Sequence, residues 1–337
     1  AGEWRRASVA EPVPRVVELE ANRASMDAVV VTCDSGEIAF EAIRRLLGQI
    51  EIGRVVIVDN ASRPDYRARL REFESSRVLL VLHDRNLGFA AGVNAGLNRS
   101  DAPFAAIVNP DCIVDRGSIA ALTEELESDS SVGLVGGLIL DPDGREQAGA
   151  RRDLPTRRHA IARWLGLAGP RWNFNHSDRP MPDHAIEVSA VSGAFMAVRR
   201  SSMRSVGGLD ERYRMHFEDL DWCARFRAAG HRVRFVPHAR AIHHKGSSSR
   251  ARPIHVCFHK HRSMVLFDRV HSTSPWARRT RWLFAAGVWA GCGLSMLATL
   301  LRSMGGRRGD GAFAGRAAHS ASISFDHRRE PDGTSAA

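Results

Sequence analysis

The stretch Phe104-Ala105-Ala106-Ile107-Val108-Asn109-Pro110-Asp111 decides how this chain is organised. Its apolar run is typical of a buried strand, and a proline cannot continue a central strand of a sheet. We therefore expect the strand to stop at Asn109 and to leave the Asp111 carboxylate at its carboxyl end. In open α/β sheets this edge is where ligands bind. Asn, Pro and Asp are also common turn residues, so a plain exit from the strand is the alternative.

Strands and helices are expected to alternate on both sides of this stretch. Short apolar runs predict strands at 28–32, 54–58, 78–82 and 132–140, and apolar residues at helical spacing predict helices at 36–50, 89–97 and 119–126. Such an order predicts an α/β fold with a mainly parallel, doubly wound sheet.

The second half of the chain is less regular. Residues 151–183 are rich in Arg, Pro and Trp, and we expect a long, mobile loop that covers a site and helps to choose its ligand. After it, the sequence predicts strands at 185–190, 194–198, 233–236 and 240–243, and helices at 218–229 and 255–270.

Composition narrows the class of protein. The net charge of +10 suits an acidic partner, such as a phosphorylated ligand, an anionic membrane surface or nucleic acid. Nucleic acid is the least favoured, because no basic stripe is interleaved with aromatic residues. The five cysteines are scattered and form no Cys-x-x-Cys pair, which indicates free thiols in a reducing compartment. The first 25 residues lack the apolar segment of a secretory signal, so we expect residues 1–25 to be a flexible arm.

Two acidic residues follow separate strands of the predicted sheet, Asp59 and Asp111, and parallel strands bring such ends to one edge. Between them, residues 85–96 enter a helix rich in glycine and alanine. Small residues and a helix N-terminus suit a phosphate, but tight packing of the helix on the sheet explains them equally well.

Acidic and basic side chains gather again in the second half. His216-Phe217-Glu218-Asp219-Leu220-Asp221-Trp222 reads either as a capped helix start or as a general base in an aromatic, sugar-binding wall. His255 and His259 have helical i, i+4 spacing, yet no cysteine or acidic residue completes a zinc set there. His243 ends a strand and could join Asp111 on a divalent ion.

Eight short segments, in order and at sensible spacing, then carry a resemblance. The chain resembles the inverting glycosyltransferases of family 2, which have the GT-A fold, and more narrowly their rhamnosyltransferase-like branch. The resemblance covers residues 28–270. Its segments are Val31-Thr32, Val58-Asp59-Asn60-Ala61-Ser62, Asn86-Leu87-Gly88-Phe89 with Asn94, Asn109-Pro110-Asp111, Ser192-Gly193-Ala194-Phe195, Gly207-Gly208-Leu209-Asp210-Glu211, Phe217-Glu218-Asp219-Leu220-Asp221 and His243-His244-Lys245-Gly246-Ser247-Ser248.

The resemblance implies roles for these residues. Asp59 would contact the nucleotide base, and Asp111 with His243 would hold Mg²⁺ or Mn²⁺ at the donor diphosphate. Asp219 would deprotonate the acceptor hydroxyl, and Glu218 would assist acceptor binding. The full expected donor site is Thr32, Asp59, Asn60, Arg85, Asn86, Gly88, Asn109 and Asp111.

Two departures from the family pattern concern the donor. Cys33-Asp34 replaces the aromatic-Asn pair usual after the first strand, and Asn109 replaces the first Asp of the family's Asp-x-Asp motif, as is frequent in the rhamnosyltransferase-like branch. The expected activity is a metal-dependent, inverting transfer of a sugar, with L-rhamnose from dTDP-L-rhamnose favoured, to a cell-envelope glycan or a polyprenyl-linked acceptor. The alternatives are a UDP-sugar donor, such as a UDP-hexose or UDP-galactofuranose, and a non-catalytic carbohydrate-binding scaffold of the same fold. A homodimer is also compatible with the sequence.

An uncharged apolar segment, residues 282–301, lies near the end of the chain and is flanked by arginines on both sides. About 20 helical residues are long enough to span a bilayer, but positive charge at both ends favours a helix that lies on an anionic membrane surface. A buried core helix is the alternative. We therefore expect a GT-A domain at 26–272, a membrane-associating helical segment at 273–304 and a disordered tail at 305–337, with the protein at the cytoplasmic face of the cell membrane.

Overall fold

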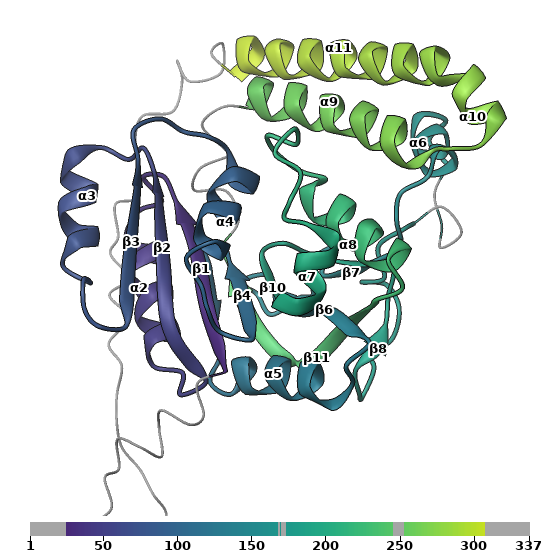
Figure 1. Cartoon of the computed structure of the whole chain (residues 1–337). Helices are drawn as coiled ribbons and strands as arrows, with labels where there is room; N and C mark the ends of the chain where they lie inside the picture. The colour runs from purple at the N-terminus through teal and green to yellow at the C-terminus, as the bar shows by residue number, and fades with distance from the viewer. Residues whose placement is uncertain (1–24, 168, 170–172, 245–252, 307–337) are drawn as a thin grey trace, which may run out of the picture. The chain divides into compact units, whose positions relative to one another are not determined.

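A nine-stranded mixed sheet forms the centre of the fold (Figure 1). The computed structural model describes residues 25–167, 169, 173–244 and 253–306, so the expectations for residues 1–24, for Lys245 to Ser248 and for 307–337 lie outside the described residues. Contacts within the chain separate it into two units, 1–296 and 297–337, and the boundary falls within the last helix. The strand order is β3-β2-β1-β4-β10-β6-β11-β5, with β8 beside β11.

The first half of the sheet is parallel, as expected. Strands β1 (Met26–Thr32), β2 (Ile52–Asn60), β3 (Val78–His83) and β4 (Phe104–Val108) pair in parallel. All residues of β1 and β4 are buried, because helices cover both faces of parallel strands. β4 ends directly before Asn109, so the prediction that this strand stops at Asn109 is confirmed.

The second half of the sheet is mixed. β10 (Phe195–Arg199) runs antiparallel between β4 and β6 (Val132–Leu140), and β11 (Arg232–His243) runs parallel to β6. The two short strands expected at 233–236 and 240–243 are one strand, whose register shifts between Val236 and Arg240. Pro237 lies in that interval and has no N–H to donate, which explains the irregularity. The remaining strands are β5 (Cys112–Val114), β7 (Arg151–Arg152), β8 (Ile186–Glu187) and β9 (Ala190–Val191).

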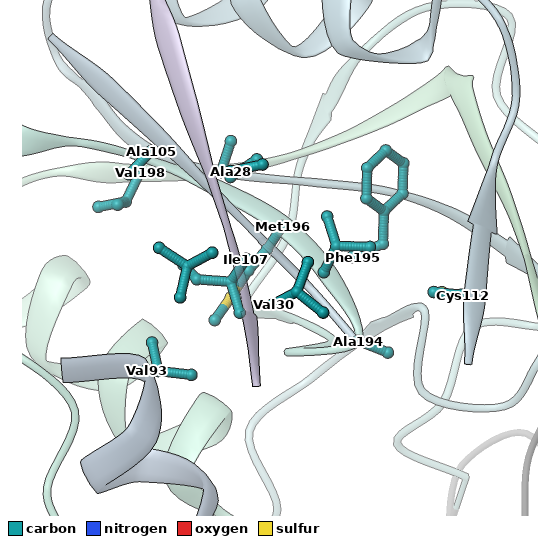
Figure 2. Packing of buried hydrophobic residues seen from close by; sticks show 14 of the residues in the cluster. Ala28, Val30, Val93, Ala105, Ile107, Cys112, Ala194, Phe195, Met196 and Val198 are labelled. Carbon is teal, nitrogen blue, oxygen red and sulfur yellow. The ribbon is translucent and has the colours of Figure 1, made fainter. Parts of the chain in front are cut away.

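Side chains from these strands interlock in the core. Figure 2 shows Val30 of β1, Ile107 of β4 and Met196 of β10 gathered near Val93 of a covering helix, with Phe195 beside them. The helices are α2 (Glu37–Leu47), α3 (Pro64–Arg71), α4 (Phe89–Leu97), α5 (Ser118–Ser128), α6 (Arg157–Trp164), α7 (Arg200–Val206), α8 (Glu218–Ala228), α9 (Pro253–His271), α10 (Pro275–Arg279) and α11 (Arg281–Gly306).

The glycines of α4 serve packing. A Cβ added to Gly92 would lie 2.6 Å from a methyl carbon of Val31, and one added to Gly96 would lie 2.4 Å from a methyl carbon of Val29. Such distances are far below a van der Waals contact, so the helix can approach β1 only with glycine at both positions. Of the two explanations for this small-residue helix, close packing on the sheet is the one observed.

The segment 151–183 has more structure than the mobile loop expected from its composition. Its described part contains β7 and α6, and α6 is tied to α9 through Arg157. The Arg157 guanidinium donates to both carboxylate oxygens of Asp268, at 2.5 and 2.7 Å, and also to the Ala277 carbonyl and the Thr280 hydroxyl. A single buried arginine thus joins the segment to the helices that follow the sheet.

Helix α11 packs against α9 (Figure 1), and Phe258 of α9 lies 5.3 Å from Trp289 of α11, measured between ring centroids. Among residues 281–301 of α11, those that are buried are Phe284, Val288 and Cys292, spaced four apart on one face. The other face leaves Trp282, Leu283 and further apolar side chains exposed. Within the described residues, Arg281–Leu301 is one helix that is long and apolar enough to cross a membrane, judged by length and composition alone.

Candidate active site

A cavity of about 750 Å³ opens at the carboxyl ends of the parallel strands. This volume is within the range of small-molecule sites in proteins. It brings together most of the predicted site residues: Thr32, Asn60, Asn86, Gly88, Asn109, Asp111, Glu218, Asp219 and His243 all line it.

The pair Asp111 and His243 lies on one wall of the cavity. Asp111 follows β4, and His243 is the last residue of β11. The Nε2 atom of His243 lies 3.0 Å from Oδ1 of Asp111, although 132 residues separate the two in sequence. Both side chains are largely buried. The expected pair is therefore assembled by strand ends from opposite halves of the sheet.

Gln147 decides which nitrogen of His243 carries a proton. The Gln147 amide donates through Nε2 to the carbonyl oxygens of His243, at 2.8 Å, and of Leu140, at 3.3 Å, so its Oε1 must be the atom that faces His243 Nδ1 at 3.0 Å. Nδ1 therefore donates its proton to Gln147. In a neutral imidazole this leaves the Nε2 lone pair pointing at a carboxylate oxygen, and two acceptors 3.0 Å apart repel each other unless a cation or a proton lies between them.

This arrangement fits a divalent cation. A carboxylate and an imidazole are suitable ligands for Mn²⁺, and a ligating histidine usually donates its second ring nitrogen to a carbonyl group, as His243 does to Gln147. Asn109 lines the same wall and its backbone N–H donates to the Ala194 carbonyl.

Asp219 lies elsewhere on the cavity wall, at the start of α8. Its Oδ2 accepts from the Arg152 guanidinium at 2.5 Å and from the Gly193 N–H at 3.0 Å. Its Oδ1 accepts from the Leu220 N–H at 2.8 Å. The carboxylate is thus held by three donors from three segments, β7, the β9–β10 turn and its own helix.

The residues before Asp219 adopt an unusual backbone. His216 and Phe217 have φ of 62° and 73°, in the left-handed region that non-glycine residues rarely occupy. Two such residues in succession are costly, and this kind of strain clusters at functional sites. Here it turns the chain sharply, so that Glu218 and Asp219 enter the cavity in the first turn of α8.

Glu218 is partly buried, with its Oε2 atom inaccessible to solvent, and this burial together with the neighbouring Asp219 charge raises its pKa to about 8. Its Oε2 has no hydrogen-bond partner among the described residues. Partial desolvation by the cavity walls also lowers the pKa of His216, although this residue is exposed at the cavity mouth. At neutral pH the Glu218 carboxyl is therefore mainly protonated.

Backbone and amide groups line the opposite side. Asn60 donates to the Gly88 carbonyl at 3.1 Å and accepts from the Leu87 N–H at 2.9 Å, while Asn86 accepts from the Gly88 N–H. Gly88 has a φ of 95°, which favours glycine. This network holds the chain between β3 and α4 against the end of β2, and Thr32 lines the cavity beside it.

Two predicted donor residues do not line the cavity. Asp59 is fully buried, and its carboxylate accepts from Arg67 at 2.6 Å and from the Ser62 N–H at 3.2 Å. Arg85 is exposed on the loop after β3. In this structure the Asp59 carboxylate holds the turn after β2. To contact the nucleotide base of a donor, it would have to give up its hydrogen bond with Arg67 or with the Ser62 N–H.

Several residues that line the cavity, and Gln147, which contacts His243 without lining it, were not foreseen from the sequence. Arg152 contacts Asp219, which is 67 residues away in sequence, and Gln147 contacts His243, which is 96 residues away. Nothing in the sequence around Arg152 or Gln147 predicts these contacts. The helices α9 and α11 add a further wall, made of Lys260, Met264, Phe267 and Phe284. Only the tertiary fold brings these residues to the site.

Comparison with known proteins identifies the class. Residues 27–207 match the model of glycosyl transferase family 2, so the chain belongs to this family and is a glycosyltransferase. An N-acetylglucosaminyl-diphospho-decaprenol L-rhamnosyltransferase of Mycobacterium tuberculosis is 30% identical over 264 residues, which cover 74% of this chain and 85% of that protein. The rhamnosyltransferase WbbL of Escherichia coli is 25% identical over half of the chain and 62% of its own length.

Solved structures agree with the GT-A fold. The mannosyltransferase PcManGT from Pyrobaculum calidifontis, in complex with GDP-Man and Mn²⁺, has a TM-score of 0.52 at 15% identity and covers 85% of this chain and 81% of its own. GalNAc-T7 with UDP, GalNAc and Mn²⁺ has a TM-score of 0.51 at 15% identity and covers 66% of this chain, which spans only 44% of it. The fold expectation is thereby confirmed.

Proposed function

We propose that this glycosyltransferase is inverting and cation-dependent, and that it transfers L-rhamnose from dTDP-L-rhamnose to a polyprenyl-linked acceptor. The observation that carries the proposal is the convergence of the Asp111–His243 pair and the Asp219 carboxylate on one cavity. The donor and acceptor are suggested by the L-rhamnosyltransferase relative, which aligns over most of both chains.

Asp111 and His243 would hold Mg²⁺ or Mn²⁺, and Gln147 would orient the His243 ring through its contact with Nδ1. When bound, the cation neutralises charge on the nucleoside diphosphate that leaves. The contact between Asp111 and His243 supports this assignment, since a carboxylate oxygen and an imidazole nitrogen 3.0 Å apart can both ligate one cation. Asn60, Asn86, Gly88 and Thr32 would line the nucleotide part of the donor site.

Asp219 would act as the general base. The acceptor hydroxyl oxygen attacks the anomeric carbon, the bond from that carbon to the diphosphate breaks with its electron pair, and the hydroxyl proton passes to Asp219. One displacement on the face opposite the leaving group inverts the configuration. Arg152 and Gly193 hold the carboxylate in place, and the protonated Glu218 carboxyl beside it can donate a hydrogen bond to the acceptor.

The apolar wall supports a lipid-linked acceptor. Met264, Phe267 and Phe284 extend the cavity toward α9 and α11; exposed apolar side chains lie on both helices, Ile254 and Phe258 on α9 and tryptophans and leucines on α11. We propose that these helices lie on the cytoplasmic face of the cell membrane, so that the head group of a polyprenyl-linked acceptor can reach Asp219 from the lipid side.

A UDP-sugar donor is the second candidate, because a structural neighbour was solved with UDP and because the nucleotide-side pair Cys33-Asp34 departs from the family pattern. Thermal shift with dTDP, UDP, GDP and dTDP-L-rhamnose, each with and without Mn²⁺, distinguishes these donors. We expect dTDP compounds to raise Tm most, and only when Mn²⁺ is present.

The Asp111→Asn variant tests the cation site in the same assay. It should lose the Mn²⁺-dependent part of the Tm increase, while the exposed-site control Asp143→Asn keeps it. An equal Mn²⁺ dependence of the Tm increase in Asp111→Asn and wild type would contradict the proposed cation site. A larger Tm increase with UDP than with dTDP would change the proposed donor but not the proposed cation site.

A further inference from the structure

A second group of metal-binding side chains lies between α9 and α11, outside the catalytic cavity. It consists of Cys257 and His261 of α9 and Cys292 of α11. One ligand atom from each, the two sulfurs and an imidazole nitrogen, all lie within 4.8 Å of one another. None of the three lines the catalytic cavity. We propose that these residues bind a zinc ion that fastens α11 to α9.

The positions in sequence explain how the group forms. Cys257 and His261 are four residues apart in one helix, so they lie on the same face. Cys292 is 2% exposed and belongs to the face of α11 that also buries Phe284 and Val288. The packing of the two helices therefore places the third ligand opposite the first two.

The distances suit tetrahedral coordination. Zinc–sulfur bonds of about 2.3 Å and zinc–nitrogen bonds of about 2.0 Å at a tetrahedral angle place the S and N ligand atoms about 3.5 Å apart. The Cys257 sulfur lies 3.6 Å from Nδ1 of His261. Thiolate and imidazole are the preferred zinc ligands, and three protein ligands leave a fourth position for water.

The proton on His261 must move when the ion binds. Nδ1 of His261 lies 2.8 Å from the Cys257 carbonyl oxygen and can donate its proton there. On metal binding this proton goes to Nε2, and the ring turns so that the Nδ1 lone pair faces the ion and no longer the Cys257 carbonyl oxygen. The two thiols each release a proton, so zinc uptake should release protons to solvent.

Cobalt is a suitable probe, because thiolate ligands give Co²⁺ a charge-transfer absorption that oxygen and nitrogen ligands do not. The catalytic pair Asp111 and His243 has no sulfur, so this band does not come from cobalt bound by that pair, and the cysteine variants below assign it to the new site. The full chain, purified under reducing conditions and stripped with chelator, should take up one equivalent of Co²⁺ with this band and lose it to Zn²⁺. Zinc should also slow alkylation of two thiols.

Cys257→Ser and Cys292→Ser should each weaken Co²⁺ binding at least ten-fold and remove zinc protection of the remaining thiol. The matched control changes the other histidine pair of the same helix, His255→Ala with His259→Ala, and should bind as wild type does. The alkylation assay on wild type needs no variant, so a serine variant that fails to fold does not remove the test.

Three results would overturn the proposal. The first is wild-type protein without a thiolate-to-cobalt band. The second is loss of the band in the His255/His259 control with retention in the cysteine variants. The third is a Cys257–Cys292 disulfide in protein isolated under non-reducing conditions with thiols blocked, since sulfurs joined to each other cannot ligate zinc.

Discussion

At the scale of single residues, Asp219 and Arg152 form a close ion pair in the catalytic cavity, with 2.5 Å between the guanidinium nitrogen and Oδ2. A carboxylate can accept a proton from the substrate only if one of its oxygens is presented to the acceptor. The guanidinium, the Gly193 N–H and the Leu220 N–H together define that orientation. Arg152 is therefore a positioning residue for the proposed base.

We expect Asp219→Asn to reduce kcat about 10²–10⁴-fold, the usual contribution of a general base. The Tm increase produced by the donor nucleotide with Mn²⁺ should persist, because Asp219 is not part of the cation pair. Near-normal turnover in this variant would exclude Asp219 as the base.

Arg152→Ala should lower kcat about ten-fold or more with little change in the KM for the donor, because it frees the carboxylate without touching the nucleotide wall. Arg152→Lys should restore part of the rate, since a cation remains near Asp219. Steady-state kinetics of both variants, beside the exposed control Arg145→Ala, measures this. An equal loss in the alanine and lysine variants with a raised donor KM would indicate a general structural defect instead.

Glu218 predicts a dependence of stability on pH. Its pKa in the folded chain is about 8, above the ordinary value of 4.5, because the group is buried beside Asp219. Between these values the folded state keeps the proton that the unfolded state has lost, so stability declines as pH rises through this window. Glu218→Gln removes this contribution.

The free energy of unfolding of Glu218→Gln, relative to wild type, should therefore increase from pH 5 to pH 8 and then level off. Urea unfolding at several pH values measures it, with the exposed Glu124→Gln as control. Parallel pH curves for wild type and Glu218→Gln would show that Glu218 titrates normally.

At the scale of elements, α4 depends on two glycines to reach β1. Gly96→Ala would place a methyl group 2.4 Å from a Val29 methyl carbon, and overpacking of this kind typically costs about 1–3 kcal/mol. Gly293→Ala is the matched control, because its added Cβ meets nothing within 4 Å and alanine favours a helix. The free energy of unfolding, measured with heat or urea, should fall in Gly96→Ala and rise slightly in Gly293→Ala. An unchanged stability of Gly96→Ala would mean that α4 can shift away from β1.

Helices α6 and α9 illustrate how an element without a clear pattern is stabilised. The helical period of α6 is weak, yet Arg157 joins it to Asp268, Ala277 and Thr280 through four hydrogen bonds. The ion pair between Arg157 and Asp268 is a tertiary contact between largely buried side chains. It orders part of the segment 151–183, whose composition alone is typical of a mobile loop.

At the scale of the whole molecule, the exposed tryptophans and leucines of α10 and α11 lie beside arginines, which suits an anionic membrane surface. Trp282→Ser with Leu283→Ser should weaken binding to vesicles that contain anionic lipid about ten-fold. Ile50→Ser, an exposed apolar residue before β2, is the control and should not change it. Co-sedimentation at two salt concentrations measures both, and equal loss in the two variants, or no binding by wild type at low salt, would contradict membrane association.

Local sequence determined much of this protein. Apolar runs specify β1, β4 and β6 because a buried parallel strand needs apolar residues at nearly every position, and Asn109-Pro110-Asp111 ends β4 because proline cannot continue the ladder. Asp111, Asp219 and His243 could be predicted as site residues from local sequence too. Each belongs to a family motif, and each stands at the end of a recognisable strand or at the start of a helix.

The tertiary structure alone decided the partners of these residues. The antiparallel direction of β10, the Gln147 contact that orients His243, the Arg152 contact that orients Asp219 and the approach of Cys292 to Cys257 all join segments far apart in the chain. Hydrogen bonds and ion pairs between such segments depend on how whole elements pack, and the identity of one partner does not specify the other. The same holds for Asp59, whose carboxylate binds Arg67 and the turn after β2, a role that its position at a strand end did not reveal.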